Sequence, residues 1–117
     1  MSRLDERVTL LEMRDRAREA VAMAAGRARN DLEKDRMLEL SLTRLVEIVG
    51  EAANRIPAEF RKQHPELPWP MMVGMRNRLI HGYDSVDLDI LWDTVRDHLP
   101  KLVEQLDRLI ARSPGSD

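Results

Sequence analysis

The 117-residue chain contains no cysteine, and this absence excludes disulfides and thiolate metal sites. Its three histidines are far apart, with no pair at the spacing at which a helix presents two metal ligands. We therefore expect no metal and no other cofactor. Aromatic residues are also scarce, with one Phe, one Tyr and two Trp. The core must therefore consist of Leu, Ile, Val, Met and Ala.

Long apolar runs are missing as well. No 18 consecutive residues are apolar, and the start MSRLDERVTL lacks the apolar segment of a secretory signal. The sequence therefore predicts a soluble cytoplasmic protein with no membrane partner. A net charge of −2 gives no overall attraction to nucleic acid. The 43% hydrophobic and 34% charged residues, in the length of one domain, are typical of a highly charged helical protein.

Apolar residues recur at helical spacing along most of the chain, and no segment shows the two-residue alternation of a strand. The fold class is therefore all-α, a bundle of four main helices and one short helix within AEFRKQH. The main helices are predicted at about residues 4–28, 36–55, 70–80 and 88–111. The first helix is expected to bury the stripe that contains Leu4, Val8, Leu11, Ala17 or Arg18, Val21 and Ala25. We assign residues 1–112 to one domain and the tail SPGSD, residues 113–117, to disorder.

Prolines and capping residues mark where these helices begin and end. Pro57 stops the second helix, and Pro70 suits the first turn of the third. Ser85 or Asp87 can cap the fourth helix. Because Pro100 falls inside the apolar pattern of that helix, we expect a kink there.

The segment MRNRLIHGYDSVD, residues 75–87, concentrates hydrogen-bonding and ionisable groups at the end of the third helix. On a helical wheel, Arg76 lies in the middle of the apolar arc, between Leu79 and Ile80. A guanidinium in that position is costly unless it meets an anion or a hydrogen-bonding partner. Arg76 is therefore either an anion-binding group or an ordinary arginine that extends to solvent or pairs with Glu47 or Glu51.

Other residues of this segment also allow a structural or a functional interpretation. Asn77 and His81 are four residues apart, so on one helix Asn77 could orient the imidazole. His81, next to Gly82, could equally be a histidine that caps the helix. Tyr83 could be a half-buried anchor.

Arg76 and His81 lie about 140° apart on a regular helix, so they do not share a face. Two routes could bring both to one phosphate. The helix could unwind near residues 80–82, or two chains could pair so that both motifs line one two-fold cleft. The small residues Gly50, Ala52 and Ala53 could allow close backbone approach at such an interface, or they could pack within one chain.

Residues 58–83 carry a small excess of positive charge. They contain four basic residues, Arg61, Lys62, Arg76 and Arg78, against two glutamates. This basic segment could follow an RNA backbone.

The segment RNRLIHGY fits the Arg-x4-His-x-Tyr signature of HEPN-domain proteins. The segments RLVEIVGEAANRIP, LPWPMMVGMRN, YDSVDLDILW and HLPKL, in this order and at this spacing, resemble the successive blocks of the HepT-like branch of that family. The similarity covers about residues 38–106 and, by length and position, the first helix.

The resemblance implies an all-α HEPN fold, a symmetric homodimer and a metal-independent endoribonuclease toxin of a two-gene toxin–antitoxin module. The implied partners are an RNA substrate and a cognate minimal nucleotidyltransferase, the antitoxin, which silences the toxin by attaching AMP to the motif tyrosine. Carried over residue by residue, Arg76 and His81 are the catalytic pair and Asn77 is a supporting polar residue. Tyr83 is the site of AMPylation.

The residue types agree with such chemistry. An imidazole can move protons near neutral pH, and a guanidinium can stabilise the negative charge that gathers on a phosphate under attack by the 2′-OH. Two alternatives stay open from the sequence. The chain could be a non-catalytic subunit of a nucleotidyltransferase that binds nucleotide or protein, or a purely structural helical dimer.

Overall fold

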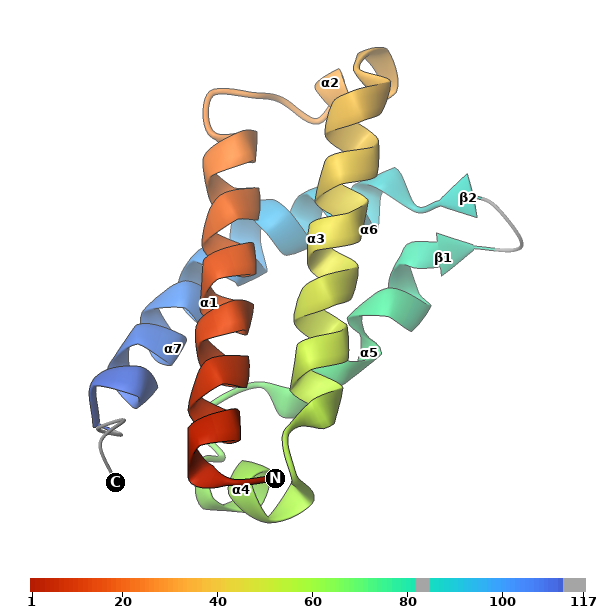
Figure 1. Cartoon of the computed structure of the whole chain (residues 1–117). Helices are drawn as coiled ribbons and strands as arrows, with labels where there is room; N and C mark the ends of the chain where they lie inside the picture. The colour runs from red at the N-terminus through yellow and green to blue at the C-terminus, as the bar shows by residue number, and fades with distance from the viewer. Residues whose placement is uncertain (82–84, 113–117) are drawn as a thin grey trace.

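The computed structural model describes residues 1–81 and 85–112, with the backbone alone described at residues 80 and 81. Within these ranges the chain is a helical bundle in which α1 and α3 run antiparallel side by side and α7 crosses α1 (Figure 1). The helices are α1 (Arg3–Ala24), α2 (Asp31–Lys34), α3 (Arg36–Arg55), α4 (Ala58–Gln63), α5 (Trp69–Leu79), α6 (Leu88–Asp93) and α7 (Leu99–Arg112). The predicted all-α class is confirmed, and a hairpin of two-residue strands joins α5 to α6.

The buried face of helix α1 overlaps only in part with the predicted stripe. Leu4 and Val8 are 60% and 57% exposed, and Leu11 and Val21 are only half-buried. The buried positions are instead Thr9, Leu10, Met13, Ala17, Ala20 and Ala24. This face packs against α3 and α7 together, and short alanine side chains let both helices approach closely. The prediction was therefore right for Ala17 and wrong for Leu4, Val8 and Ala25, which are exposed.

Helix α3 has the predicted bounds and lies closely against α5. A Cβ atom built on Gly50 would lie 3.0 Å from the backbone oxygen of Met72, so the two backbones meet at this glycine. Ala52 and Ala53 are fully buried within the same chain. Of the two interpretations of these small residues, packing within one chain is the one observed. The contact also fixes the position of α5, whose last turn carries Arg76.

The C-terminal helical segment begins at a cap and is interrupted by a π turn. Asp87 caps α6 by accepting a hydrogen bond from the backbone N–H of Ile90 at 3.1 Å. Residues 94–98 form the π turn, after which α7 begins at Leu99. Pro100 has no N–H, and its ring would clash with the carbonyl four residues earlier in a regular helix. The predicted irregularity is therefore present, as a widened turn directly before the proline.

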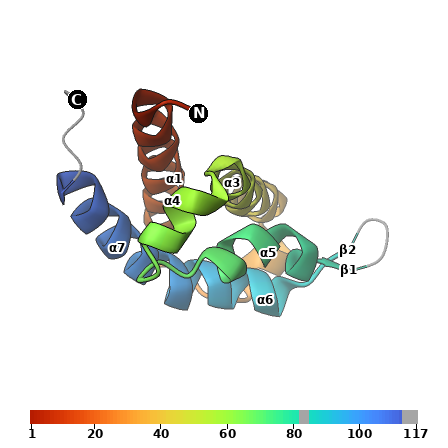
Figure 2. The same ribbon diagram turned by 90° about the horizontal axis from the view of Figure 1, so that it is seen from below.

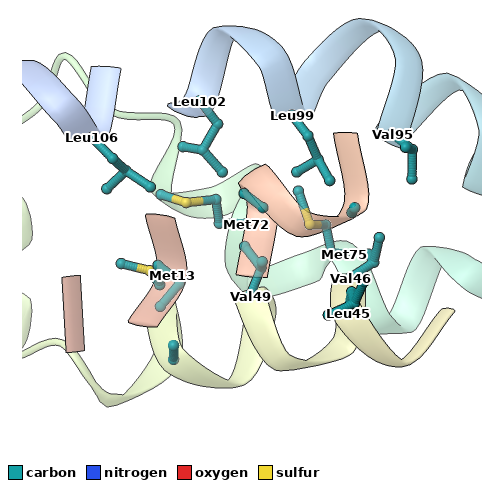
Figure 3. Close-up of a cluster of buried hydrophobic side chains, with 14 of the residues drawn as sticks. Met13, Leu45, Val46, Val49, Met72, Met75, Val95, Leu99, Leu102 and Leu106 are labelled. Carbon is teal, nitrogen blue, oxygen red and sulfur yellow. The ribbon is translucent and has the colours of Figure 1, made fainter. Parts of the chain in front are cut away.

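The core lies where α7 faces α3 and α5, with one side closed by α1. Leu99, Leu102 and Leu106 of α7 point toward Met72 and Met75 of α5 (Figure 3). The core consists of Leu, Val, Ile, Met and Ala with two tryptophans, as the composition predicts. In the part of the chain that the structure describes, no helix is long and apolar enough to cross a membrane.

An ion-pair cluster joins α1 to α7 at the surface of the bundle. Asp107 accepts from Arg14 at 2.9 Å and from Arg18 at 3.0 Å. Hydrogen bonding from Arg14 has the largest effect on the pKa of Asp107 and lowers it below its ordinary value; burial opposes this with the next largest effect, and the charge of Arg18 adds to the lowering. A carboxyl whose pKa is lowered by folding stabilises the protein above its unfolded pKa, and that stabilisation is lost as the pH falls through the folded pKa.

We therefore expect Asp107→Asn to lower the free energy of unfolding at neutral pH by less than about 1 kcal/mol, because the side chains are partly exposed. The difference from the unsubstituted chain should disappear at low pH. Urea unfolding at neutral pH and below the carboxyl pKa measures both effects. Asp93→Asn, at an exposed carboxylate of α6, is the control. A difference that persists at acid pH would contradict the assignment.

Candidate active site

The polar segment lies where α5 ends and the chain changes from helix to strand. Helix α5 ends at Leu79, whose carbonyl accepts a hydrogen bond from the N–H of Asp87 at 2.8 Å. Strand β1 (Ile80–His81) then pairs antiparallel with β2 (Ser85–Val86), with Ile80 opposite Val86 and His81 opposite Ser85 (Figure 1). His81 therefore follows the helix in extended backbone.

This geometry corrects the position predicted for His81. The wheel kept His81 on the helix, four residues after Asn77, whereas the helical geometry stops at Leu79 because the next residues pair with β2. The i,i+4 relation between Asn77 and His81 is therefore absent. The backbone leaves the helix near residue 80, as the first of the two routes requires, and the second route, a pairing of two chains, stays a prediction. Gly82 and Tyr83 lie outside the described residues, as does the tail 113–117.

Arg76 combines a helix position among buried residues with an exposed charge. Met72 and Leu79, on one side of it on the wheel, are fully buried, and Val73, on the other side, is half-buried, whereas the Arg76 side chain is 61% exposed. Its Nε atom lies 3.5 Å from Oε2 of Glu47 on α3, and Glu47 is itself only 19% exposed. Arg44 lies 4.0 Å from the other oxygen of Glu47. The side chain thus extends to solvent and pairs with Glu47, one of the two carboxylates that the sequence indicates.

The strength of this ion pair decides what Arg76 can do. A pair between exposed groups contributes only about 0–1 kcal/mol, so stability alone gives little reason for the arginine. The contact at Nε places the guanidinium beside Glu47 while the group stays accessible. A guanidinium held in this way can bind a phosphate through two parallel N–H donors.

Asn77 and Arg78 lie on other sides of the same turn. Asn77 is exposed and lines a groove between α4 and α5, about 670 Å³ in volume, which was not predicted from the sequence. Arg78 is exposed and donates from Nη2 to the backbone oxygen of Met71 at 3.1 Å. The consecutive residues Arg76 and Asn77 therefore lie on two different surfaces, Arg76 toward Glu47 and Asn77 toward α4.

The sequence is similar to a family of ribonucleases. The model of the family described as HepT-like ribonuclease matches residues 13–109. A protein named "Probable ribonuclease HepT" from Thermococcus cleftensis is 41% identical over 75 residues, which cover 64% of this chain and 68% of that protein. A protein named "Putative RNase MJ1380" from Methanocaldococcus jannaschii is 32% identical over 107 residues, which cover 92% and 98%. No solved structure matches this chain.

Proposed function

The chain belongs to the HepT-like ribonuclease family, and from this membership we propose that it is a metal-independent endoribonuclease whose catalytic residues are Arg76 and His81. Cleavage begins when the 2′-oxygen of a ribose attacks the adjacent phosphorus. The bond from phosphorus to the 5′-oxygen breaks, which leaves a 2′,3′-cyclic phosphate and a 5′-hydroxyl end. DNA lacks the 2′-OH and is not a substrate.

His81 and Arg76 have different roles in this step. An imidazole ordinarily titrates near neutral pH, so His81 can accept the proton of the 2′-OH and supply one to the departing 5′-oxygen. The guanidinium of Arg76 stabilises the charge that develops on the phosphate oxygens. Asn77 is a supporting polar residue that contacts the RNA next to this phosphate.

One observation carries the proposal for these residues: the exposed guanidinium of Arg76 stands three residues before the helix ends, and His81 follows in extended backbone. A continuous helix would hold the two residues on different faces. The extended residues remove that obstacle. We further propose a symmetric homodimer in which two such motifs line one cleft. In such a cleft, His81 of one chain can remove the proton of the 2′-OH while His81 of the other chain returns a proton to the 5′-oxygen.

The same site offers a means of control. In a toxin–antitoxin module, a cytoplasmic nucleotidyltransferase antitoxin would attach AMP to Tyr83, two residues past His81. The added phosphate would repel the RNA phosphate, and the nucleotide would fill the space beside it. Co-expression with a nucleotidyltransferase encoded beside this chain is expected to raise its intact mass by one AMP unit, and Tyr83→Phe should abolish the increase. An unchanged mass of the unsubstituted chain would contradict this step.

The activity itself is tested with the purified chain in excess EDTA. Single-stranded RNA should be cut to fragments with 2′,3′-cyclic phosphate ends, and DNA of the same sequence should stay intact. RNA that remains intact with correctly folded protein, both with and without divalent cations, would contradict the nuclease function. Cleavage that requires a divalent cation would contradict only its metal independence.

A second candidate is a non-catalytic subunit that binds a nucleotidyltransferase through this surface. The observation that favours it is the Arg76–Glu47 contact, which gives Arg76 a partner within the chain. On this alternative, RNA stays intact and Arg76→Ala weakens only the complex with the nucleotidyltransferase. Co-purification and the RNA assay, performed on the same variants, distinguish the two functions.

A further inference from the structure

A groove between α4 and α5 begins beside the motif and leads away from it. Helix α4 crosses the lower end of the α1–α3 pair, and the chain then turns back into α5 (Figure 2). The groove between them has a volume of about 670 Å³, within the range of small-ligand sites. Its wall on α5 ends at Asn77, the neighbour of Arg76.

The floor of this groove is apolar and rigid. Leu67 and Trp69 are almost fully buried, and Pro65 and Pro70 add stiff backbone on either side of them. The indole N–H of Trp69 donates to the carbonyl of His64 at 2.8 Å, which fixes the ring. A ligand would therefore meet a surface that needs little rearrangement.

Two cations at the rim of the groove have no acidic partner among the described residues. Most arginines of this chain pair with a carboxylate, including Arg14, Arg44 and Arg76. By contrast, neither Arg61 nor Lys62 forms an ion pair with any residue in the part of the chain that the structure describes; Arg61 donates only to the backbone oxygen of Ile56, at 3.1 Å. These two charges are available to an anion.

A glycine keeps the middle of the groove open. Glycine destabilises a helix interior relative to alanine, so each helical glycine needs a reason. Gly50 has one, because its Cβ would lie 3.0 Å from the backbone of α5. No packing contact explains Gly74, because no atom lies within 4 Å of a Cβ built at this position. Gly74 lines the groove. A glycine at this position lowers the stability of the helix and leaves room for a ligand in the groove.

We propose that this groove binds a nucleotide of single-stranded RNA next to the scissile phosphate. The proposal rests on the endoribonuclease function and identifies a substrate-binding subsite for it. The apolar floor at Leu67 and Gly74 receives the base, and Arg61 and Lys62 bind the phosphate on its far side. Asn77 offers both an amide donor and a carbonyl acceptor to the base edge. Asn77 follows Arg76 about 100° further around the helix, so an RNA strand that passes over this turn of α5 places the bound nucleotide beside the one under attack.

The first test fills the groove without removing any charge. Gly74→Leu places a side chain in the open space and replaces a glycine within a helix, so its melting temperature should rise or stay unchanged. Its affinity for RNA should nevertheless fall about tenfold or more, the size expected for the loss of one well-bound base. Gly74→Ala gives a similar gain in helix stability with a much smaller side chain, and it should bind RNA nearly as the unsubstituted chain does. If Gly74 had a merely structural role, RNA affinity would fall only where the melting temperature also falls.

The second test removes the two rim charges. The double variant Arg61→Gln, Lys62→Gln should lower RNA affinity and reduce the slope of log affinity against log salt by about 0.7 for each phosphate that no longer meets a cation. The control is Lys101→Gln, Arg108→Gln, which removes the same charge from exposed positions of α7. Because Arg61 also holds a backbone contact, Lys62→Gln alone is measured as well, and a reduced slope is expected there too.

The probe in both tests is a short single-stranded 2′-O-methyl RNA of mixed sequence, which cannot undergo attack by the 2′-oxygen. Intact ordinary RNA after incubation with the unsubstituted chain would show that the proposed function has failed. If the chain cleaves RNA but Gly74→Leu and the charge variants bind the probe as well as their controls do, the groove inference is overturned while the nuclease function stands. A loss of dimerisation or of nucleotidyltransferase binding at unchanged RNA affinity would likewise overturn it and identify a protein contact.

Discussion

Replacement of His81 by Ala is expected to reduce the rate of RNA cleavage in EDTA by about a hundredfold to ten-thousandfold, the usual size of the contribution from a positioned acid or base. The loss should appear in kcat, because the proton moves only during the chemical step. Affinity for the uncleavable 2′-O-methyl RNA should change little. The far-UV circular dichroism spectrum should stay that of a helical protein, since His81 follows the end of α5.

Arg76→Ala should cause a loss of similar or slightly smaller size, about a hundredfold to a thousandfold, because one donor to a developing oxyanion is removed. Arg76→Lys should recover only part of the rate, since an ammonium cannot make two parallel hydrogen bonds. Arg78→Ala is the matched control. Arg78 lies on the same turn, carries the same charge and is also exposed, but its observed contact is with the backbone of Met71.

These variants also separate catalysis from structure. Since the Arg76 side chain is 61% exposed and its ion pair with Glu47 is open to solvent on that side, Arg76→Ala should change the free energy of unfolding by about 1 kcal/mol or less. Full cleavage activity in either His81→Ala or Arg76→Ala would remove that residue from the catalytic site. A folded Arg76→Leu variant that cleaves RNA normally would favour the structural interpretation of this arginine.

The largest effect on stability is expected from Leu99→Ala. Leu99 is fully buried, begins α7 directly after the π turn and faces Met75 in the core (Figure 3). Truncation of a buried leucine costs about 2–5 kcal/mol, from reduced burial and from the cavity left behind. We expect the upper part of that range, because Pro100 stiffens the backbone and limits the collapse of the cavity.

Such a loss is a large share of the roughly 5–15 kcal/mol by which a domain of this size is stable. Urea unfolding followed by circular dichroism measures it, and the slope against urea should stay unchanged. Leu40→Ala, at a leucine that is 49% exposed, removes the same atoms and should cost about 1 kcal/mol or less. Equal losses in the two variants would contradict the assignment of Leu99 to the core.

The parts of the fold that could be predicted are those set by local sequence signals. The bounds of α3 agree with the prediction, since Asp35 caps its start by accepting from the N–H of Leu38 and Pro57 follows its end. The π turn lies where Pro100 predicts an irregularity. The buried face of α1 was assigned in this way only at Ala17, because Ala20 and Ala24 become core only through contact with α3 and α7.

In the candidate site, too, the features set by local sequence signals could be predicted and those set by tertiary contacts could not. The wheel placed Arg76 among buried positions and indicated Glu47 as one of two partners, and both features are present. The end of α5 before His81 depends on pairing with β2, a contact across a turn that helical periodicity does not encode. The groove depends on how α4 packs beside α5. Its local signal was Gly74, a glycine within a helix that no packing contact explains.

The π turn allows one amphipathic segment to pack against two different helices. The buried residues Leu91, Trp92, Leu99 and Leu102 would form a single stripe on an uninterrupted helix. The wider turn between them rotates the second half of that stripe relative to the first. As a result α6 contacts α5 while α7 contacts α1, and one run of apolar residues closes two sides of the bundle. Deletion of a single residue from this turn would restore helical phase and turn one of the two halves away from its neighbour.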